Sequence, residues 1–227
     1  MDFHEANRKL LGDDTVASLG KLSVLLVGAG GLGGYVANGL IRLGVGKLTI
    51  VDMDTYETSN LNRQLFSSIE TIGAYKAEVV RDSCLEINPE ASITAYLKPV
   101  ETLDEKLAEV PFDLVIDAVD TVATRLFLET FSSRKGVPLL HGAIGGWYGQ
   151  IGIAMPGSGL LSRIYGDKEA GLEKTLGSPT FTPGVVGCMM VSECVKYVLK
   201  DERALINRIL FIDLLHHDYE VIYESSK

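Results

Sequence analysis

A glycine-rich turn between an apolar run and a helical segment is the feature that most constrains this chain. Residues 22–27 (LSVLLV) are typical of a strand buried on both faces, and residues 31–43 predict a helix that ends before Gly44. The turn between them satisfies the pattern GxGxxG, with glycines at Gly28, Gly30, Gly31 and Gly33. Glycine lets a backbone approach phosphate groups closely, and a helix N-terminus offers unpaired N–H donors. This context predicts a nucleotide site.

A membrane-spanning helix is the alternative for the same stretch. Residues 22–41 carry no charge and include a GxxxG spacing. Glycines interrupt the stretch where a spanning helix needs continuous apolar cover, and its first part has the composition of a strand. We therefore expect no membrane segment and no membrane partner.

An acid at the end of a second strand supports the nucleotide site. Residues 47–51 (KLTIV) form an apolar run closed by Asp52, which lies 19 residues after Gly33. An acid in this position accepts hydrogen bonds from ribose hydroxyls. A glycine turn that only packs helix on strand is the alternative. The motif alone does not distinguish NAD from ATP.

Apolar runs and helical segments alternate as far as residue 140. Predicted strands at 92–97, 113–117 and 137–140 are separated by predicted helices at 73–86, 103–109 and 121–134. Strict alternation of this kind predicts an α/β fold with a doubly wound, Rossmann-like, mostly parallel sheet. The end of the chain, with strands at 208–214 and 218–223, predicts a C-terminal antiparallel extension.

We expect one domain with four parts. They are an N-terminal helical arm (1–20), a nucleotide-binding core (21–155), a flap or crossover loop (156–182) and a C-terminal helix with strands (183–227). Residues 149–155 predict a strand that pairs antiparallel at the sheet edge. Residues 156–179 are Gly-rich and without periodicity, and they are the candidate mobile flap. Thr182 and Pro183 predict the N-cap and first turn of the next helix.

Charge and cysteine content limit the class of protein. The chain has 21 Lys plus Arg against 30 Asp plus Glu, a net charge of −9, which argues against a nucleic-acid partner. Its three cysteines (Cys84, Cys188, Cys194) form no CxxC pair, which excludes a disulfide scaffold and a four-cysteine zinc site. The first residues contain no apolar run of a signal peptide, so we expect a cytoplasmic protein.

Two basic residues that follow Asp52 in the sequence indicate that the nucleotide is a triphosphate. Arg63 and Lys76 lie on separate predicted elements after the ribose acid. Backbone N–H groups largely suffice for a dinucleotide pyrophosphate, whereas a reacting triphosphate needs arginine and lysine side chains aimed at it. Taken alone, either residue could be an ordinary surface cation. Only the spacing of both residues after Asp52 argues against that alternative.

These residues resemble the ThiF/MoeB/HesA family, the bacterial relatives of ubiquitin-activating enzymes. The resemblance rests on Asn7-Arg8, the glycine turn, the segment SNLNRQ (59–64), Lys76 in GAYKA, Asp117-Ala-Val-Asp120, the turn at 142–150 and the helix after Pro183. It covers nearly the whole chain. It implies adenylation of the C-terminal glycine carboxylate of a ubiquitin-like sulfur-carrier protein ending in Gly-Gly, with release of pyrophosphate.

The resemblance also implies a role for each residue. Asp52 would bind ribose, Asn60, Arg63 and Lys76 would hold phosphates, Asp120 would hold Mg²⁺, and Arg8 would reach the partner subunit's site in a homodimer. Asp54 and Gln64 are further nucleotide-binding candidates, and the cofactors are ATP and Mg²⁺. Asp120 has an alternative role as the cap of the following helix, and Arg8 as a solvated charge.

The proposed reaction suits such a site. Attack of a carboxylate on the α-phosphorus brings two anions together, so the site must neutralise charge with cations and metal. The carboxylate is already ionised at pH 7 and needs no base. Trp147 and Tyr148 lie in the turn after the predicted fifth strand, where they either flank the carrier's tail or pack internally.

Departures from the family narrow the prediction. The two CxxC pairs that bind structural zinc in many members are absent, and residues 156–179 contain no cysteine. Cys188 and Cys194 lie on a predicted apolar helix, where buried thiols are inert. We therefore expect no zinc, no covalent carriage of the carrier, and a separate sulfur donor.

Three other functions stay open at this point. A superfamily member of the tRNA-modifying dehydratase type would activate a non-carrier substrate, although the acidic balance disfavours tRNA. A non-catalytic scaffold would dock a carrier without needing Arg63, Lys76 and Asp120. A nicotinamide oxidoreductase would need a substrate domain that the chain lacks. The pathway of the carrier (thiamine, molybdopterin, tungsten cofactor or cysteine) is not specified.

Overall fold

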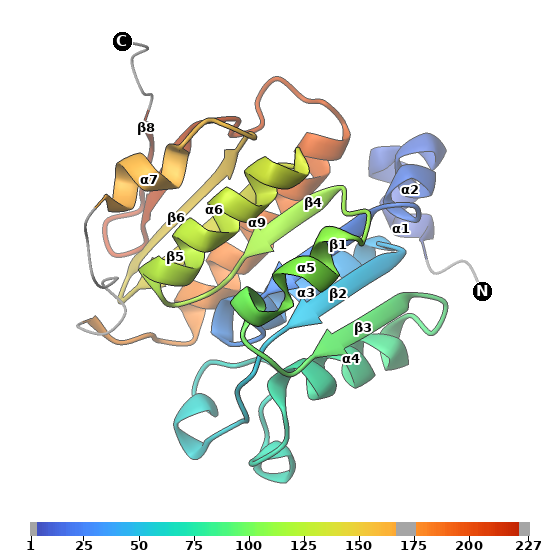
Figure 1. Ribbon diagram of the computed structural model, residues 1–227, viewed down its shortest axis with the longest axis vertical. Helices are drawn as coiled ribbons and strands as arrows, with labels where there is room; N and C mark the ends of the chain where they lie inside the picture. The colour runs from blue at the N-terminus through green and yellow to red at the C-terminus, as the bar shows by residue number, and fades with distance from the viewer. Residues whose placement is uncertain (1–3, 167–175, 223–227) are drawn as a thin grey trace.

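A single eight-stranded sheet organises the computed structural model, which describes residues 4–166 and 176–222. The strand order is β3-β2-β1-β4-β5-β6-β7-β8, and pairing is parallel from β3 to β5 and antiparallel from β5 to β8 (Figure 1). The strands are β1 (Ser23–Val27), β2 (Lys47–Val51), β3 (Ser92–Tyr96), β4 (Leu114–Asp117), β5 (Leu139–Gly145), β6 (Tyr148–Ala154), β7 (Ile209–Asp213) and β8 (Asp218–Ile222). The predicted fold class is confirmed.

Helices cover both faces of the sheet (Figure 1). On one face lie α3 (Gly31–Leu43), α4 (Lys76–Ile87) and α9 (Phe181–Val198), and on the other lie α5 (Asp104–Ala108), α6 (Val122–Lys135) and α7 (Leu160–Tyr165). Successive residues of a strand point to opposite faces, so Leu26 joins the core under α3 and Leu25 joins the core under α6. Apolar side chains fill most of both layers, which accounts for the uninterrupted apolar runs in the sequence.

Two short helices and three 3₁₀ turns complete the described chain: α1 (Glu5–Leu11), α2 (Asp13–Leu19), η1 (Thr58–Asn60), η2 (Ile69–Thr71) and η3 (Val100–Leu103). The α1–α2 arm lies near the amino ends of the strands (Figure 1). The side chain of Asn7 donates a 2.9 Å hydrogen bond to the Arg42 carbonyl in the last turn of α3. No helix in the described residues is long and apolar enough to span a membrane.

The strand order reverses direction at β1 and β4, which are neighbours in the sheet. From β1 the chain builds outward through β2 and β3, and from β4 it builds the other way through β5. Crossovers therefore leave on opposite faces at this point and open a crevice outside the carboxyl ends of the two strands, where ligands bind in open α/β sheets.

The glycine turn fits this crevice because neighbouring backbone leaves no room for a side chain. Gly28 has a φ of 92°, and a β-carbon there would lie 2.5 Å from the Ala118 carbonyl oxygen after β4. A β-carbon on Gly33 would collide with the Gly28 carbonyl. These two glycines thus bring β1, the start of α3 and the end of β4 into close contact.

Three local predictions were wrong. The strand β6 does not lie at the edge, because β7 and β8 pair beyond it. Thr182 is not the N-cap of α9, which is Thr180; the Thr182 hydroxyl instead donates a 2.6 Å hydrogen bond to the Gly146 carbonyl. The irregular segment 156–179 contains α7, and its residues 167–175 lie outside the described residues.

Candidate active site

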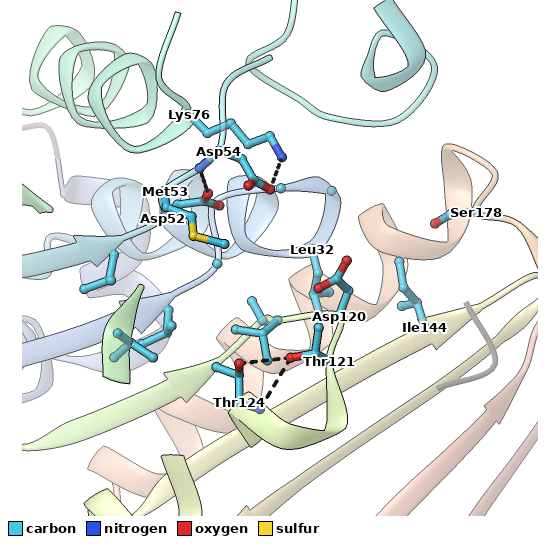
Figure 2. Close-up of a pocket in the computed structure, with 18 of the residues that line it drawn as sticks. Leu32, Asp52, Met53, Asp54, Lys76, Asp120, Thr121, Thr124, Ile144 and Ser178 are labelled. Atoms are coloured by element: carbon cyan, nitrogen blue, oxygen red, sulfur yellow. Dashed lines mark hydrogen bonds and ion pairs between the residues drawn. The ribbon is translucent and has the colours of Figure 1, made fainter. Parts of the chain in front are cut away.

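A cleft of about 520 Å³ opens at the carboxyl ends of β1 to β4 (Figure 2). Predicted residues that line it are Gly28, Gly30, Gly31, Asp52, Asp54, Arg63, Lys76 and Asp120. Other lining residues come from the segments after β3 and β4, from Ile144 in β5 and from residues 177–178. The cleft therefore brings together most of the candidates, which lie between residues 28 and 120 of the sequence.

Asp52 is anchored to the glycine turn by its own carboxylate. One oxygen accepts a 2.7 Å hydrogen bond from the Ala29 backbone N–H, and the other accepts a 2.8 Å bond from the Asp54 N–H. Burial raises the pKa of Asp52, while the Ala29 and Asp54 N–H donors and the Lys76 charge oppose that shift. A carboxylate has further acceptor capacity beyond two bonds, so Asp52 is fixed and still able to accept from a ribose.

Lys76 enters the cleft from the first residue of α4. Its ammonium forms a 3.0 Å ion pair with the Asp54 carboxylate, and its side chain is only 10% exposed (Figure 2). The backbone supports the pair, because the Lys76 N–H also donates to the Asp54 carbonyl at 2.9 Å. Asp54 therefore holds the lysine in place at the polar wall of the cleft.

Arg63 lies beside the start of α3. Its guanidinium donates to the Ser59 carbonyl at 2.9 Å and to the Asn62 side-chain oxygen at 2.8 Å. Asn62 also donates to the Ser178 carbonyl at 3.2 Å, which ties the Arg63 segment to the far wall of the cleft. Arg63 and Asn62 thus lie next to the N-terminus of α3, which offers N–H donors to an anion.

Asp120 points into the cleft from the turn after β4 (Figure 2). The N-cap of α6 is Thr121, whose hydroxyl oxygen accepts from the Thr124 N–H. The alternative that Asp120 caps this helix is therefore wrong. The exposed Asp120 carboxylate is available to bind a ligand in the cleft.

Asn60 and Gln64 are buried and do not line the cleft. The Asn60 side chain accepts from the Glu57 N–H at 3.0 Å and so caps the η1 turn. Its carbonyl accepts from the Arg63 N–H at 3.1 Å. The Gln64 amide lies against Gly30. In this conformation both residues support the turn that carries Arg63 and do not face the cleft.

Seven polar lining residues were not site candidates in the sequence analysis: Ser59, Asn62, Lys98, Glu101, Thr121, Thr124 and Ser178. Lys98 and Glu101 follow β3, and Glu101 accepts a 2.8 Å hydrogen bond from the Thr124 hydroxyl. A signal for them existed, because the carboxyl ends of all parallel strands share one edge of a sheet. Lys98 in particular follows the predicted strand at 92–97.

Arg8 lies far from the cleft of its own chain. It belongs to α1, which is bonded to the last turn of α3, whereas the glycine turn stands at the first residue of α3. The 13 residues of α3 separate the two by about 20 Å. Arg8 pairs with Asp13 at 3.2 Å.

Aromatic side chains stand at the β5–β6 turn. Trp147 is 43% exposed, and its ring packs on Phe181 with ring centroids 4.4 Å apart. Tyr148 stacks on Phe211 at 5.9 Å. Leu176 lies against Gly146 in the same region. Both aromatics make internal contacts, and Trp147 also presents a face to solvent.

The thiols do not form a reactive site. Burial raises the pKa of Cys84 and of Cys194 to about 12, so both stay protonated. The prediction that Cys188 is buried was wrong, because this residue is exposed on α9. None of the three lines the cleft.

The family model for the ThiF family matches residues 4–227. This chain belongs to the ThiF family. The predicted resemblance is confirmed. The glycine turn, Arg63, Lys76 and Asp120 from its motifs line the cleft, whereas Asn7 and Arg8 lie far from it.

Named relatives in the family are activating enzymes. The chain is 35% identical over 206 residues to the molybdopterin-synthase adenylyltransferase of Escherichia coli, covering 85% of this chain and 79% of that enzyme. It is 32% identical over 227 residues to the sulfur carrier protein adenylyltransferase of Thermus thermophilus, covering 92% of this chain and 81% of that enzyme. It is 33% identical over 203 residues to the SAMP-activating enzyme E1 of Haloferax volcanii (88% and 75%).

Solved structures show the same ThiF-type fold at lower identity. The E. coli MccB structure with ATP has a TM-score of 0.81 at 18% identity, covering 97% of this chain and 71% of that one. The E. coli tRNA N6-threonylcarbamoyladenosine dehydratase has a TM-score of 0.75 at 24% identity, covering 87% and 94%. These likenesses concern the fold alone.

Proposed function

We propose that this protein is an ATP- and Mg²⁺-dependent adenylyltransferase that activates the C-terminal glycine carboxylate of a ubiquitin-like sulfur-carrier protein ending in Gly-Gly. The observation that carries the proposal is the convergence of Asp52, Lys76, Arg63 and Asp120 on one cleft beside the N-terminus of α3. The names of the adenylyltransferase relatives support the same reaction.

The positions of these residues suit ATP. Asp52 accepts hydrogen bonds from ribose hydroxyls at the end of β2, and the glycine turn and α3 N-terminus receive the phosphates. Arg63 and Lys76 flank this anion site and neutralise the triphosphate. The apolar lining residues Val51 and Val100 give the base a dry surface.

The balance of charge in the cleft calls for a metal ion. Its lining contains four acidic residues (Asp52, Asp54, Glu101, Asp120) and three basic ones (Arg63, Lys76, Lys98). A triphosphate adds further negative charge, so a divalent cation is needed for neutrality. Asp120 offers the oxygen ligand that Mg²⁺ prefers, and Mg²⁺ is usually held by one or two carboxylates plus substrate phosphates. When bound, Mg²⁺ withdraws charge from the phosphate oxygens.

The reaction needs orientation and charge neutralisation from the protein. The carrier's carboxylate oxygen forms a bond to the α-phosphorus, and the bond from that phosphorus to the bridging oxygen of the β-phosphate breaks. Pyrophosphate leaves with the electron pair. Lys76 and Arg63 stabilise the charge that moves onto it, and no proton is transferred.

The carrier's tail has an entrance at the β5–β6 side of the cleft. Ile144, Gly177 and Ser178 line that side, and the Gly146 N–H donates to the Gly177 carbonyl at 2.8 Å. A Gly-Gly terminus carries no side chains, so it can approach these backbones closely. The exposed Trp147 face stands nearby for contact with the residues that precede the two glycines.

We also propose a homodimer in which Arg8 serves the partner's cleft. Its position at the far end of α3 rules out service to its own cleft without rearrangement of the arm. Sulfur then comes from a separate donor protein, because Cys84 and Cys194 are buried and Cys188 lies outside the cleft.

Pyrophosphate exchange into ATP tests the function. With Mg²⁺ and a carrier ending in Gly-Gly, labelled pyrophosphate should appear in ATP, and a carrier with the last glycine removed should give none. Exchange that depends on tRNA and not on any carrier would favour the dehydratase type. Binding of carrier without exchange would favour a scaffold.

A further inference from the structure

A buried polar cluster joins the turn that carries Asp120 to three other parts of the fold. Its members come from β4, α6, β5, β6 and α7: Asp117, Arg125, His141, Gln150 and Tyr165. Asp117 and His141 are fully buried, and Arg125 is 2% exposed. None of the five lines the cleft. Burying charged groups is costly, so such a cluster calls for an explanation.

Side chains of the cluster hold both polar groups of Val119. The Asp117 carboxylate accepts from the Val119 N–H at 3.1 Å, and the Arg125 guanidinium donates to the Val119 carbonyl at 2.6 Å. Val119 lines the cleft, and its carbonyl belongs to the peptide bond that leads into Asp120. The plane of that peptide bond and the φ angle of Asp120 together set the direction in which the Asp120 side chain leaves the backbone.

The guanidinium is itself held in a closed ring of contacts. It donates to the Tyr165 hydroxyl at 2.5 Å and lies 3.8 Å from the Asp117 carboxylate. His141 completes the ring: its Nδ1 lies 2.7 Å from Asp117, and its Nε2 lies 3.1 Å from the Tyr165 oxygen. With the proton on Nδ1, His141 donates to Asp117 and accepts from Tyr165. Tyr165 thus connects α7 to the Asp120 turn.

We infer that Arg125 is a positioning residue for the proposed reaction. By holding the Val119 carbonyl, Arg125 orients the Asp120 carboxylate toward Mg²⁺. The inference rests on the proposed function. Tyr165 acts one step further away, because it fixes the guanidinium that makes this contact. Lysine cannot replace Arg125, since its single ammonium lacks the planar fork that reaches Val119 and Tyr165 together.

Metal dependence of nucleotide binding tests this role. We would measure the Kd of ATP by calorimetry over a series of Mg²⁺ concentrations and in EDTA, for wild type, Arg125→Lys and Tyr165→Phe. Arg125→Lys should raise the Mg²⁺ concentration for half-maximal affinity by about 10-fold or more, which is typical for loss of a group that orients a metal ligand. The Kd in EDTA should change by less than about threefold. Tyr165→Phe should shift the midpoint in the same direction by a smaller factor.

A matched control lies on the same helix. Arg134 pairs with Asp104 at 2.6 Å on the surface, and Arg134→Lys should leave the Mg²⁺ midpoint unchanged. An Arg125→Lys variant with the wild-type midpoint, or with equal losses of affinity with and without Mg²⁺, would overturn the inference. Thermal unfolding identifies any variant that does not fold. If Arg125→Lys does not fold, the Mg²⁺ midpoint of Tyr165→Phe, which keeps the aromatic ring, decides whether the inference stands. A wild type that does not bind ATP with Mg²⁺ would instead reject the proposed function.

Discussion

The ammonium of Lys76 lies 3.0 Å from the carboxylate of Asp54, although 22 residues separate them in the chain. This pair holds a nearly buried cation at the polar wall of the cleft before any nucleotide binds. A cation that is already in position loses little freedom when a phosphate arrives, which is how a preorganised site lowers a barrier.

Replacement of Lys76 by Ala should lower the rate of pyrophosphate exchange by about 10²-fold or more, and Arg63→Ala should do the same. The physical reason is the loss of a cation beside the leaving group. Lys106, whose ammonium lies over the Tyr96 ring 4.7 Å from its centroid, does not line the cleft, so Lys106→Ala is the control. Exchange that persists in Lys76→Ala and Arg63→Ala would remove both residues from the reaction.

Nucleotide choice should appear in thermal unfolding. A ligand that binds the folded state alone raises the melting temperature, and at about 100 times its Kd it adds about 2.7 kcal/mol of stability. We expect ATP with Mg²⁺ to raise the melting temperature and NAD to leave it unchanged. A shift with NAD and none with ATP would favour a nicotinamide enzyme.

His141 should make stability depend on pH. Burial lowers the pKa of His141 below its usual 6.5, although the Asp117 hydrogen bond opposes this shift. Below about pH 6.5 the unfolded chain then binds the proton more readily than the folded chain, so stability falls as pH falls. We would measure the free energy of unfolding with urea between pH 5 and 7.5. As pH is lowered through this range, this free energy should fall more steeply in wild type than in His141→Gln.

The comparison with His141→Gln isolates this group. His216 has a raised pKa because of its hydrogen bond to Asp213, and its contribution has the opposite sign: it is present at low pH and is lost as pH rises. Both proteins contain His216, so its effect cancels. Identical slopes in the two proteins would show that folding does not shift the pKa of His141, which would contradict the prediction.

The proposed dimer can be tested by mixing inactive variants. Arg8→Ala and Asp120→Ala homodimers should both be impaired. If Arg8 serves the partner's cleft, a mixed dimer has one complete site and one site with both lesions. Random reassortment makes about half of the dimers mixed, so exchange should recover to about a quarter of wild type in closed symmetric dimers. No recovery after verified subunit exchange would contradict the shared site.

Local patterns were sufficient for much of the fold and part of the site. The glycine turn, β2 with Asp52 at its end, and the helix α6 were all predicted, because each depends on residues close together in the chain. The shared edge of a parallel sheet then explains why Asp52 and Asp120 meet, since both follow the carboxyl ends of strands.

Other features depend on contacts between segments that are distant in sequence. The sequence pattern could not show that Asn60 turns away from the cleft, that α1 binds the far end of α3, or that Arg125 reaches Tyr165. These outcomes follow from the packing of several elements around one point, where the direction of each side chain depends on neighbours contributed by other elements. Periodicity and spacing describe a single element, and they carry no information on that shared packing.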